Sequence, residues 1–185
     1  AGLLENLIEN NYKSIVDVGF AEGYYLVGLG LKMPNAKLIG YDLAQDAHQQ
    51  CSQNAKVNGL SLNRLKLFDS WSLETHRSST LEPALVIVDC EGCEFEMFSS
   101  LSVIDLKRAD WVIETHDFII DTSTKFVTSV LEETHDITHI ESVSALDKIS
   151  KLPFDLRAVF TKQEQLRLVE EGRPKGQVWI VATRK

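Results

Sequence analysis

The residues best suited to chemistry follow two apolar runs in the middle of the chain. They are Asp89, Glu91, Glu94, Glu114, His116 and Asp117. Carboxylates that lie close to a histidine can transfer protons, and the imidazole is the natural proton acceptor because its unperturbed pKa of about 6.5 lies near physiological pH. We therefore take His116 as the first candidate for a general base. Three carboxylates could orient it or act in its place: Asp89, Glu91 and Glu114.

The same carboxylates would disturb one another unless positive charge compensates them, because neighbouring acidic groups raise each other's pKa values. A divalent cation such as Mg²⁺, bound by Asp89, Glu114 and His116, would supply that charge and lower the pKa of a bound hydroxyl. The alternatives stay open at this point. Some of these carboxylates can cap helices or point into solvent, and His116 can be a hydrogen-bonded structural histidine.

A glycine-containing turn near the start of the chain has the pattern of a nucleotide-type cofactor site. Its residues are Asp17, Val18, Gly19, Phe20, Ala21, Glu22 and Gly23. Gly19 permits a tight turn, and Gly23 lets the following helix pack close to the sheet or to a ligand. The dehydrogenase fingerprint begins its glycines directly after the strand, whereas here the acidic Asp17 lies inside the strand. A carboxylate at this place suits an ammonium group and would repel a pyrophosphate, so the turn favours S-adenosylmethionine over NAD.

Polar residues after the next two strands complete the predicted cofactor site. Asp42 ends the second strand, where a carboxylate can accept hydrogen bonds from two ribose hydroxyls. Asp69 and Ser70 end the third strand, beside the expected position of an adenine. The predicted cofactor-binding residues are thus Asp17, Gly19, Phe20, Ala21, Gly23, Asp42, Leu43, Asp69 and Ser70. The alternatives are a helix-capping role for Asp42 and a solvated loop position for Asp69.

Short apolar runs alternate with helical patterns along the chain, which is typical of βαβ units and a parallel sheet. The predicted strands cover residues 14–19, 37–42, 64–68, 84–90, 109–115, 136–143 and 177–182. The predicted helices cover an opening segment at 3–8 and residues 24–32, 44–58, 94–101, 123–134 and 162–171. The run at 84–90 lacks alternation, as expected of a central strand buried on both faces.

This order of elements predicts one α/β domain over residues 1–185, with a mostly parallel, Rossmann-like sheet and helices on both faces. Residues 144–174 form an insertion between the last two strands, and we interpret it as a lid. Because ligands of open parallel sheets bind at the carboxyl ends of the strands, the glycine turn and the acidic cluster should face one another at one edge.

At these motifs the sequence resembles the FkbM family of O-methyltransferases. That family reads Asp-Val-Gly-Ala-Asn-x-Gly-Tyr-Tyr at the cofactor turn, and residues 17–25 read Asp-Val-Gly-Phe-Ala-Glu-Gly-Tyr-Tyr. It reads Asp-Val-Glu-Gly-Ala-Glu after the fourth strand, where residues 89–94 read Asp-Cys-Glu-Gly-Cys-Glu, and its Glu-x-His is matched at 114–116. The resemblance spans roughly residues 14–183.

The FkbM resemblance implies a seven-stranded class I methyltransferase fold and S-adenosylmethionine-dependent methyl transfer to a hydroxyl. The acceptor would be a small molecule or a sugar-containing metabolite. The chain departs from the family pattern at Phe20, Ala21, Glu22 and Cys93. These departures leave open a variant substrate or a catalytically inactive, methyltransferase-like binding module. An NAD-linked oxidoreductase is the alternative from another enzyme class.

Charge and composition narrow the expected partners and location. The formal net charge is −8, which disfavours nucleic acid as a partner. No apolar stretch approaches the roughly 20 residues that span a bilayer, so we expect no membrane partner. The sequence is silent on oligomeric state. Three cysteines, an odd number, argue against a disulfide framework and for a reducing, cytoplasmic location.

Two of the cysteines form a Cys-x-x-Cys pattern, Cys90-Glu-Gly-Cys93. We interpret them as small residues that fill a tight turn. A redox pair is the alternative, because such pairs work at strand-to-helix turns.

Overall fold

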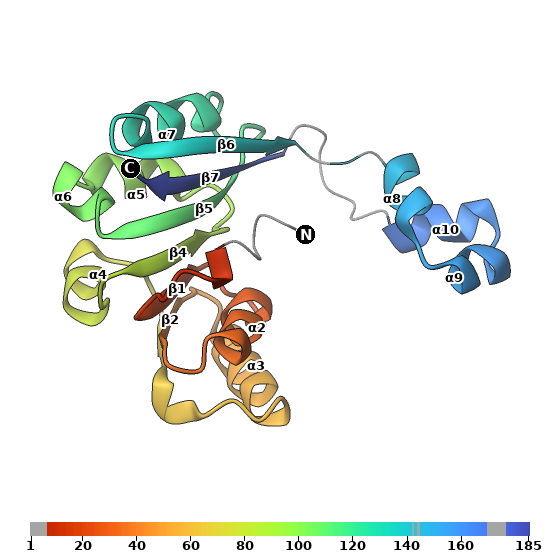
Figure 1. The fold of residues 1–185 in the computed structure, drawn as a ribbon, viewed down its shortest axis with the longest axis horizontal. Coiled ribbons are helices and arrows are strands. Elements are labelled where there is room, and N and C mark those ends of the chain that lie inside the picture. Colours follow the sequence, from red (N-terminus) through yellow and green to blue (C-terminus); the bar gives the residue numbers. More distant parts are fainter. Residues whose placement is uncertain (1–6, 142, 144, 170–176) are drawn as a thin grey trace.

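A seven-stranded sheet forms the centre of the chain (Figure 1). The computed structural model describes residues 7–141, 143, 145–169 and 177–185. The strands are β1 (Ser14–Val18), β2 (Lys37–Tyr41), β3 (Leu65–Phe68), β4 (Ala84–Val88), β5 (Ala109–Thr115), β6 (His135–Glu141) and β7 (Val178–Arg184). Their spatial order is β3-β2-β1-β4-β5-β7-β6. Only β7 is antiparallel to its neighbours, β5 and β6, which confirms the predicted mostly parallel sheet.

The central strands are buried on both faces. Every residue of β1, β4 and β5 is buried, as the unbroken apolar run of β4 predicted. Helices cover the sheet from two sides and form two separate apolar clusters. The helices that flank the sheet are α2 (Tyr24–Lys32), α3 (Gln45–Val57), α4 (Leu73–Ser79), α5 (Glu94–Ser100), α6 (Val103–Leu106) and α7 (Ser123–Leu131).

The strand order reverses next to β1, because β1 pairs with β2 on one side and with β4 on the other. The helices that follow β1 and β4 therefore leave the sheet on opposite faces, and a crevice opens between the carboxyl ends of these two strands. This crevice is where the glycine turn after β1 and the acidic residues after β4 meet.

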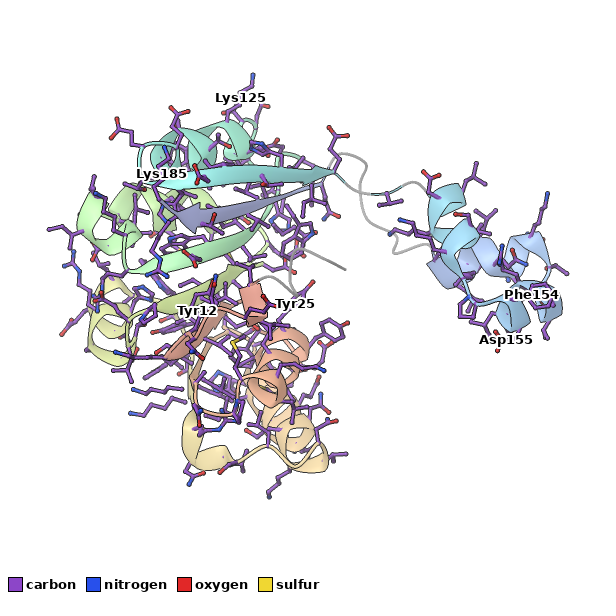
Figure 2. The ribbon with its side chains drawn as sticks, in the orientation of Figure 1. Tyr12, Tyr25, Lys125, Phe154, Asp155 and Lys185 are labelled. Atoms are coloured by element: carbon purple, nitrogen blue, oxygen red, sulfur yellow. A yellow bond between two sulfur atoms is a disulfide. The ribbon has the colours of Figure 1, made fainter. Side chains whose placement is uncertain are left out.

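The predicted insertion contains three helices in its described part, α8 (Ala145–Lys151), α9 (Phe154–Val159) and α10 (Lys162–Val169). They lie apart from the sheet in Figure 1, and Figure 2 places Phe154 and Asp155 on this outlying unit. Phe154 and Val159 are 78% and 77% exposed. The helical unit thus buries little apolar surface of its own, and its role as a lid stays a prediction.

Most predicted elements agree with the structure within two or three residues, but four helices of the described residues were not predicted: α4, α6, α8 and α9. Helix α4 is seven residues long and α6 four, so neither offers enough turns for a periodic pattern. Each is instead begun by a serine cap: Ser72 accepts from the amide of Thr75, and Ser102 forms a capping box with Asp105. The predicted opening helix at 3–8 lies mostly outside the described residues.

Candidate functional site

The turn between β1 and α2 has a backbone that requires glycine at two places. Gly19 and Gly23 both have φ +86, a region that residues with a Cβ rarely adopt. A Cβ on Gly19 would come within 1.9 Å of the carbonyl oxygen of Asp89, and one on Gly23 within 2.5 Å of Cys51 Sγ. The turn therefore lies directly against the backbone that follows β4.

Asp17 lies beneath this turn as a buried carboxylate that lacks a partner. Its side chain is 1% exposed, and neither oxygen finds a hydrogen-bond partner in the described part of the chain. Burial raises the pKa of Asp17 to about 8, and the charges of Asp89 and Asp42 add to the rise. The nearby backbone amide of Leu26, which does not meet the geometry of a hydrogen bond to Asp17, offsets only part of this rise. A buried acid of this kind is suited to a cationic partner, because a positive charge nearby would restore its ionised form.

Asp42 organises the loops on the other side of the crevice. Its Oδ2 accepts from the backbone amide of Ala21 at 2.8 Å, and its Oδ1 accepts from that of Ala44 at 2.8 Å. Asp42 thus ties the glycine turn to the start of α3. Each carboxylate oxygen keeps lone-pair capacity for a further donor, so a ribose contact remains possible alongside this positioning role.

A pocket of about 750 Å³ opens at the carboxyl ends of β1, β2 and β4. Six of the nine predicted cofactor residues line it: Gly19, Ala21, Asp42, Leu43, Asp69 and Ser70. Asp17 and Gly23 are outside the lining and shape the turn from behind. The pocket wall also contains Trp71, whose buried Nε1 has no hydrogen-bond partner among the described residues. No motif in the sequence pointed to Trp71 as a pocket residue.

Phe20 was predicted to bind the cofactor, but its ring lies in the apolar core and outside the pocket lining. It is 3% exposed within the apolar cluster under α2. Its ring packs over Gly40, where a Cβ would come within 2.6 Å of it, and lies 5.4 Å from the ring of His48. The side chain of Phe20 thus helps to pack the turn and does not line the pocket.

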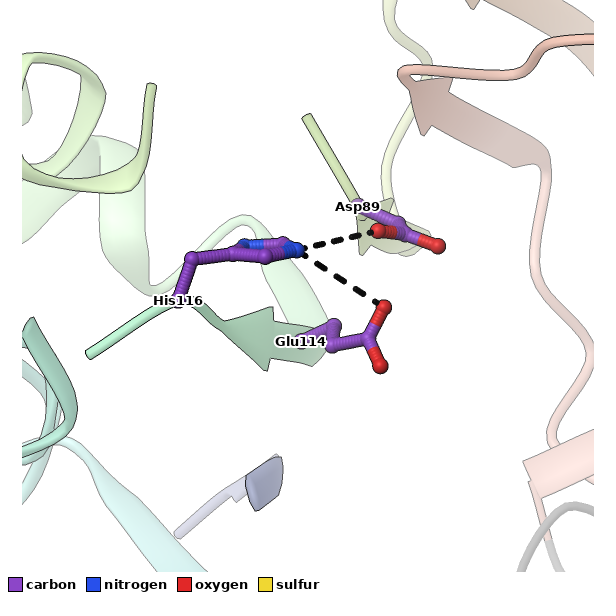
Figure 3. A group of neighbouring side chains, drawn as sticks. All are labelled: Asp89, Glu114 and His116. Atoms are coloured by element: carbon purple, nitrogen blue, oxygen red, sulfur yellow. Dashed lines mark ion pairs between the residues drawn. The ribbon is translucent and has the colours of Figure 1, made fainter. Parts of the chain in front are cut away.

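His116 is the centre of the acidic cluster after β4 and β5 (Figure 3). The ring is fully buried, and its Nδ1 lies 2.5 Å from Oε1 of the equally buried Glu94. Its Nε2 faces three carboxylates, at 3.4 Å from Glu91, 3.6 Å from Asp89 and 3.9 Å from Glu114. The structure therefore brings together all four predicted catalytic residues, and it adds Glu94 as the partner of the imidazole.

The surroundings of His116 favour its charged form. Burial alone would lower its pKa, but the hydrogen bond and charge of Glu94 and the charges of Glu91 and Asp89 raise it above the ordinary value. Two carboxylates of the cluster also act on Tyr25. Burial raises the pKa of Tyr25 to about 12, and the charges of Asp89 and Glu114 add to the rise. Tyr25 therefore lies near the cluster, with its ring 5.8 Å from that of Trp179. The Tyr-Tyr of the cofactor motif was the available signal for it.

Asp89, Glu114 and His116 also satisfy a geometric condition for a metal site. One ligand atom from each lies within 4.8 Å of the other two. Glu114 and His116 reach the same side of the sheet because they are two residues apart at the end of β5. Asp117 has a different role: its carboxylate accepts from the amide and hydroxyl of Thr124, both at 2.8 Å, and so stabilises the start of α7.

The cysteines correct an expectation drawn from their number. Cys90 and Cys93 form a disulfide, and Cys51 is the free, buried cysteine. An odd count of three excludes only complete pairing, so it does not exclude one local pair. The disulfide closes the turn between Asp89 and Glu94, in which Glu91 and Gly92 have φ +52 and +109. The two cysteines also line the pocket, so they do more than fill a tight turn.

Comparisons with known proteins identify the fold and leave the family open. No protein-family model and no curated protein sequence matches the chain. Among solved structures, it is similar to the O-methyltransferase TomG of Streptomyces achromogenes, involved in tomaymycin synthesis and solved with S-adenosylmethionine (TM-score 0.63, 14% identity, 98% of this chain and 77% of that chain). It is also similar to an O-methyltransferase of Bacillus cereus in complex with SAH (TM-score 0.62, 11% identity, 98% and 78%).

A third structural similarity is to a protein of another description, an rRNA methylase of Streptococcus thermophilus (TM-score 0.59, 12% identity, 98% and 93%). All three identities are low, so what the chain shares with these proteins is the Rossmann-like methyltransferase fold. This confirms the predicted fold class. None of the helices in the described ranges is long and apolar enough to cross a bilayer.

Proposed function

We propose that the chain is an S-adenosylmethionine-dependent methyltransferase that methylates a hydroxyl of a small molecule or sugar-containing metabolite. The observation that carries the proposal is Asp17, a buried carboxylate without a partner beneath a glycine turn at the reversal point of the sheet. S-adenosylmethionine supplies a methyl group that its sulfonium already activates, so the protein must bind it, align the acceptor and accept a proton.

The residues that line the pocket, together with Asp17 beneath the glycine turn, fit this cofactor part by part. Asp17 suits the ammonium of the amino-acid head, because that cation would compensate its buried charge. Asp42 lines the pocket and retains lone pairs for ribose hydroxyls. Asp69 and Ser70 line the far end, where an adenine amine would find polar partners. The volume of about 750 Å³ lies within the usual range for small-molecule sites, roughly 300–1,000 Å³.

The acidic cluster supplies the acceptor chemistry. Glu94 accepts a hydrogen bond from Nδ1–H of His116, which leaves the lone pair at Nε2 directed towards Asp89 and Glu114. His116 can accept the hydroxyl proton at Nε2, and the neighbouring carboxylates would stabilise the resulting cation. Alternatively, the cluster holds a divalent cation that makes the hydroxyl more acidic. Glu94 orients the imidazole in the same way in both versions.

Calorimetric titration with S-adenosylmethionine, S-adenosylhomocysteine and NAD in parallel tests the proposal. We expect micromolar binding of the first two and none of NAD. Binding of NAD alone would favour an oxidoreductase, and binding of none would favour an inactive binding module. Asp46→Asn changes an exposed acid on α3 and serves as the matched control for Asp17→Asn, which should weaken cofactor binding.

The finer assignments rest on the same motifs. We propose that the chain is FkbM-like, since its three motifs follow that family's order, although four positions depart from it. We also propose a cytoplasmic location, where Cys90 and Cys93 would be held as reduced thiols. Labelling of both thiols in intact cells would support this location, and an intact disulfide, as in the structure, would contradict it. Nucleic acid is a less suitable acceptor, because the net charge of −8 repels a phosphate backbone.

A further inference from the structure

We propose that Asp89, Glu114 and His116 bind a divalent transition-metal ion, such as Mn²⁺, Co²⁺ or Zn²⁺, in preference to Mg²⁺. This inference rests on the proposed function and deepens it, because Asp89 lines the pocket and the ion would lie at its wall. An ion there would activate an acceptor hydroxyl. The three side chains come from two adjacent strand ends, after β4 and at the end of β5 (Figure 3).

The distances around Nε2 of His116 are those of ligands around a shared ion. This nitrogen is buried and has no hydrogen-bond partner among the described residues. Oxygens of Asp89 and Glu114 lie 3.6 and 3.9 Å from it, too far for good hydrogen bonds. Ligand atoms that each lie about 2.0–2.2 Å from one ion are separated by roughly 3–4 Å. An ion therefore fits between these atoms with little movement of the chain.

The other ring nitrogen of His116, Nδ1, has the carboxylate partner that is common for metal-binding histidines. Metal-binding histidines usually donate the other ring N–H to a carboxylate, which fixes the tautomer and ring orientation. Glu94 Oε1 lies 2.5 Å from Nδ1 of His116, and both side chains are fully buried. A surface histidine bound by chance to an ion would lack this buried support.

The donor set decides which ion is favoured. Mg²⁺ prefers oxygen ligands and retains several waters, whereas imidazole suits transition metals. Here one of the three donors is a buried imidazole nitrogen with a fixed tautomer. Glu91, whose oxygen lies 3.4 Å from the same nitrogen and whose side chain is 67% exposed, could add a fourth ligand. Three protein ligands would leave a position for the acceptor oxygen, as in catalytic metal sites.

The experiment is a titration of the tag-free full chain with MnCl₂, ZnCl₂ and MgCl₂ by calorimetry. Cobalt absorption spectra of the unmodified chain provide a second readout, because imidazole ligation changes the d–d bands. We expect Mn²⁺ or Zn²⁺ to bind at least about tenfold more tightly than Mg²⁺. Glu94→Gln should weaken binding by about 10–100-fold, and His116→Asp should shift the preference towards Mg²⁺ by replacing nitrogen with oxygen.

His139→Asn is the matched control, because His139 is an exposed histidine on β6 and its loss should leave the affinity unchanged. Equal affinity for Mg²⁺ and Mn²⁺, or Co²⁺ spectra without an imidazole ligand, would overturn the inference even if the variants fail to fold. A chain that binds S-adenosylhomocysteine but no metal would refute the metal site and leave the proposed function intact. A chain that binds metal but no cofactor would refute the proposed function and leave the metal site intact.

Discussion

The two halves of the site are constructed from different parts of the chain. The half after β1 and β2 is shaped by backbone: positive φ at Gly19 and Gly23, and backbone amides held by Asp42. The half after β4 and β5 is built from side chains: His116, Glu94 and Glu114 are buried, and Asp89 and the exposed Glu91 lie beside them. The shape of the first half depends on glycines, because a Cβ at Gly19 or Gly23 would collide with neighbouring atoms. The chemistry of the second half depends on the imidazole and carboxylate groups themselves.

This difference explains which departures from the family pattern are tolerable. At Phe20 and Ala21, where the sequence departs from the FkbM pattern, backbone groups of this chain hold the turn. Phe20 is accommodated in the core, and Ala21 still donates its amide to Asp42. Losing His116 or Glu94 would instead remove a functional group that the backbone cannot replace.

The largest effect should come from Gly19→Ala in the backbone-shaped half. The added Cβ would come within 1.9 Å of the Asp89 carbonyl oxygen, at φ +86. We expect loss of cofactor binding and a fall in the free energy of unfolding of about 3 kcal/mol or more, from strain and overpacking together. Chemical denaturation and calorimetry with S-adenosylhomocysteine measure both.

Two other glycines serve as graded controls for Gly19→Ala. Gly59 has φ +73 and Gly28 lies in α2, and a Cβ at either place meets nothing within 4 Å. Gly59→Ala should cost about 1–2 kcal/mol through backbone strain alone, and Gly28→Ala should stabilise by up to about 1 kcal/mol. Equal effects at all three positions would contradict the close approach of the turn to Asp89.

Asp17→Asn should separate stability from binding. Since the folded pKa of Asp17 is about 8 against an ordinary value of 3.8, ionisation destabilises the ligand-free fold increasingly as pH rises from about 4 to 8. Removing the charge should raise the free energy of unfolding at pH 7 by on the order of 3–4 kcal/mol, at about 1.4 kcal/mol per pKa unit. The same change should weaken cofactor binding. A destabilised variant with normal binding would show that Asp17 is structural.

The sequence predicted most of the sheet because its signals are local. Buried parallel strands such as β4 are continuous apolar runs, and the glycine turn and the Glu-x-His at 114–116 have fixed spacing. Their meeting at one edge follows from the parallel arrangement. Short helices such as α4 give too few turns to be recognised.

The missed features depend on distant packing. The contact of Glu94 with His116 joins residues 22 positions apart, and no periodic pattern encodes it. Trp71 lines the pocket directly after Asp69 and Ser70, but no motif distinguishes it in the sequence. The Cys90–Cys93 disulfide was not predicted, because the odd number of cysteines was taken as evidence against disulfides. The Cys-x-x-Cys spacing at a strand-to-helix turn was the signal that could have revealed it.

His76, which lies on α4 outside both halves, should give the fold a pH dependence opposite to that of Asp17. It is 1% exposed, with its ring 6.1 Å from that of Trp71 and 6.3 Å from that of Trp111. Burial, and secondly the charge of Arg108, lowers its pKa from 6.5 to about 4. The fold thus favours neutral His76, so this stabilisation is complete above pH 6.5 and is lost as pH falls towards 4.

The loss from His76 should approach about 3 kcal/mol at 1.4 kcal/mol per pKa unit. Denaturation from pH 4 to 8 measures it: His76→Gln should flatten the rise in stability between pH 4 and 6.5. Asp17→Asn should instead make that rise steeper, because the opposing slope disappears. A His76→Gln curve that parallels the unmodified chain would place the acid sensitivity elsewhere.

Asp42 offers the test with the smallest expected effect. It combines the features of both halves, because its side chain is a functional group that holds backbone amides in place. Asp42→Ala removes the acceptors for Ala21 and Ala44, and affinity for S-adenosylhomocysteine should fall by about 1–3 kcal/mol. Asp42→Asn keeps one carbonyl acceptor and so should preserve part of the turn. If Asp42→Asn binds as weakly as Asp42→Ala but is as stable as the unmodified chain, the carboxylate binds ribose directly. If affinity and stability fall in parallel, Asp42 acts by positioning the turn.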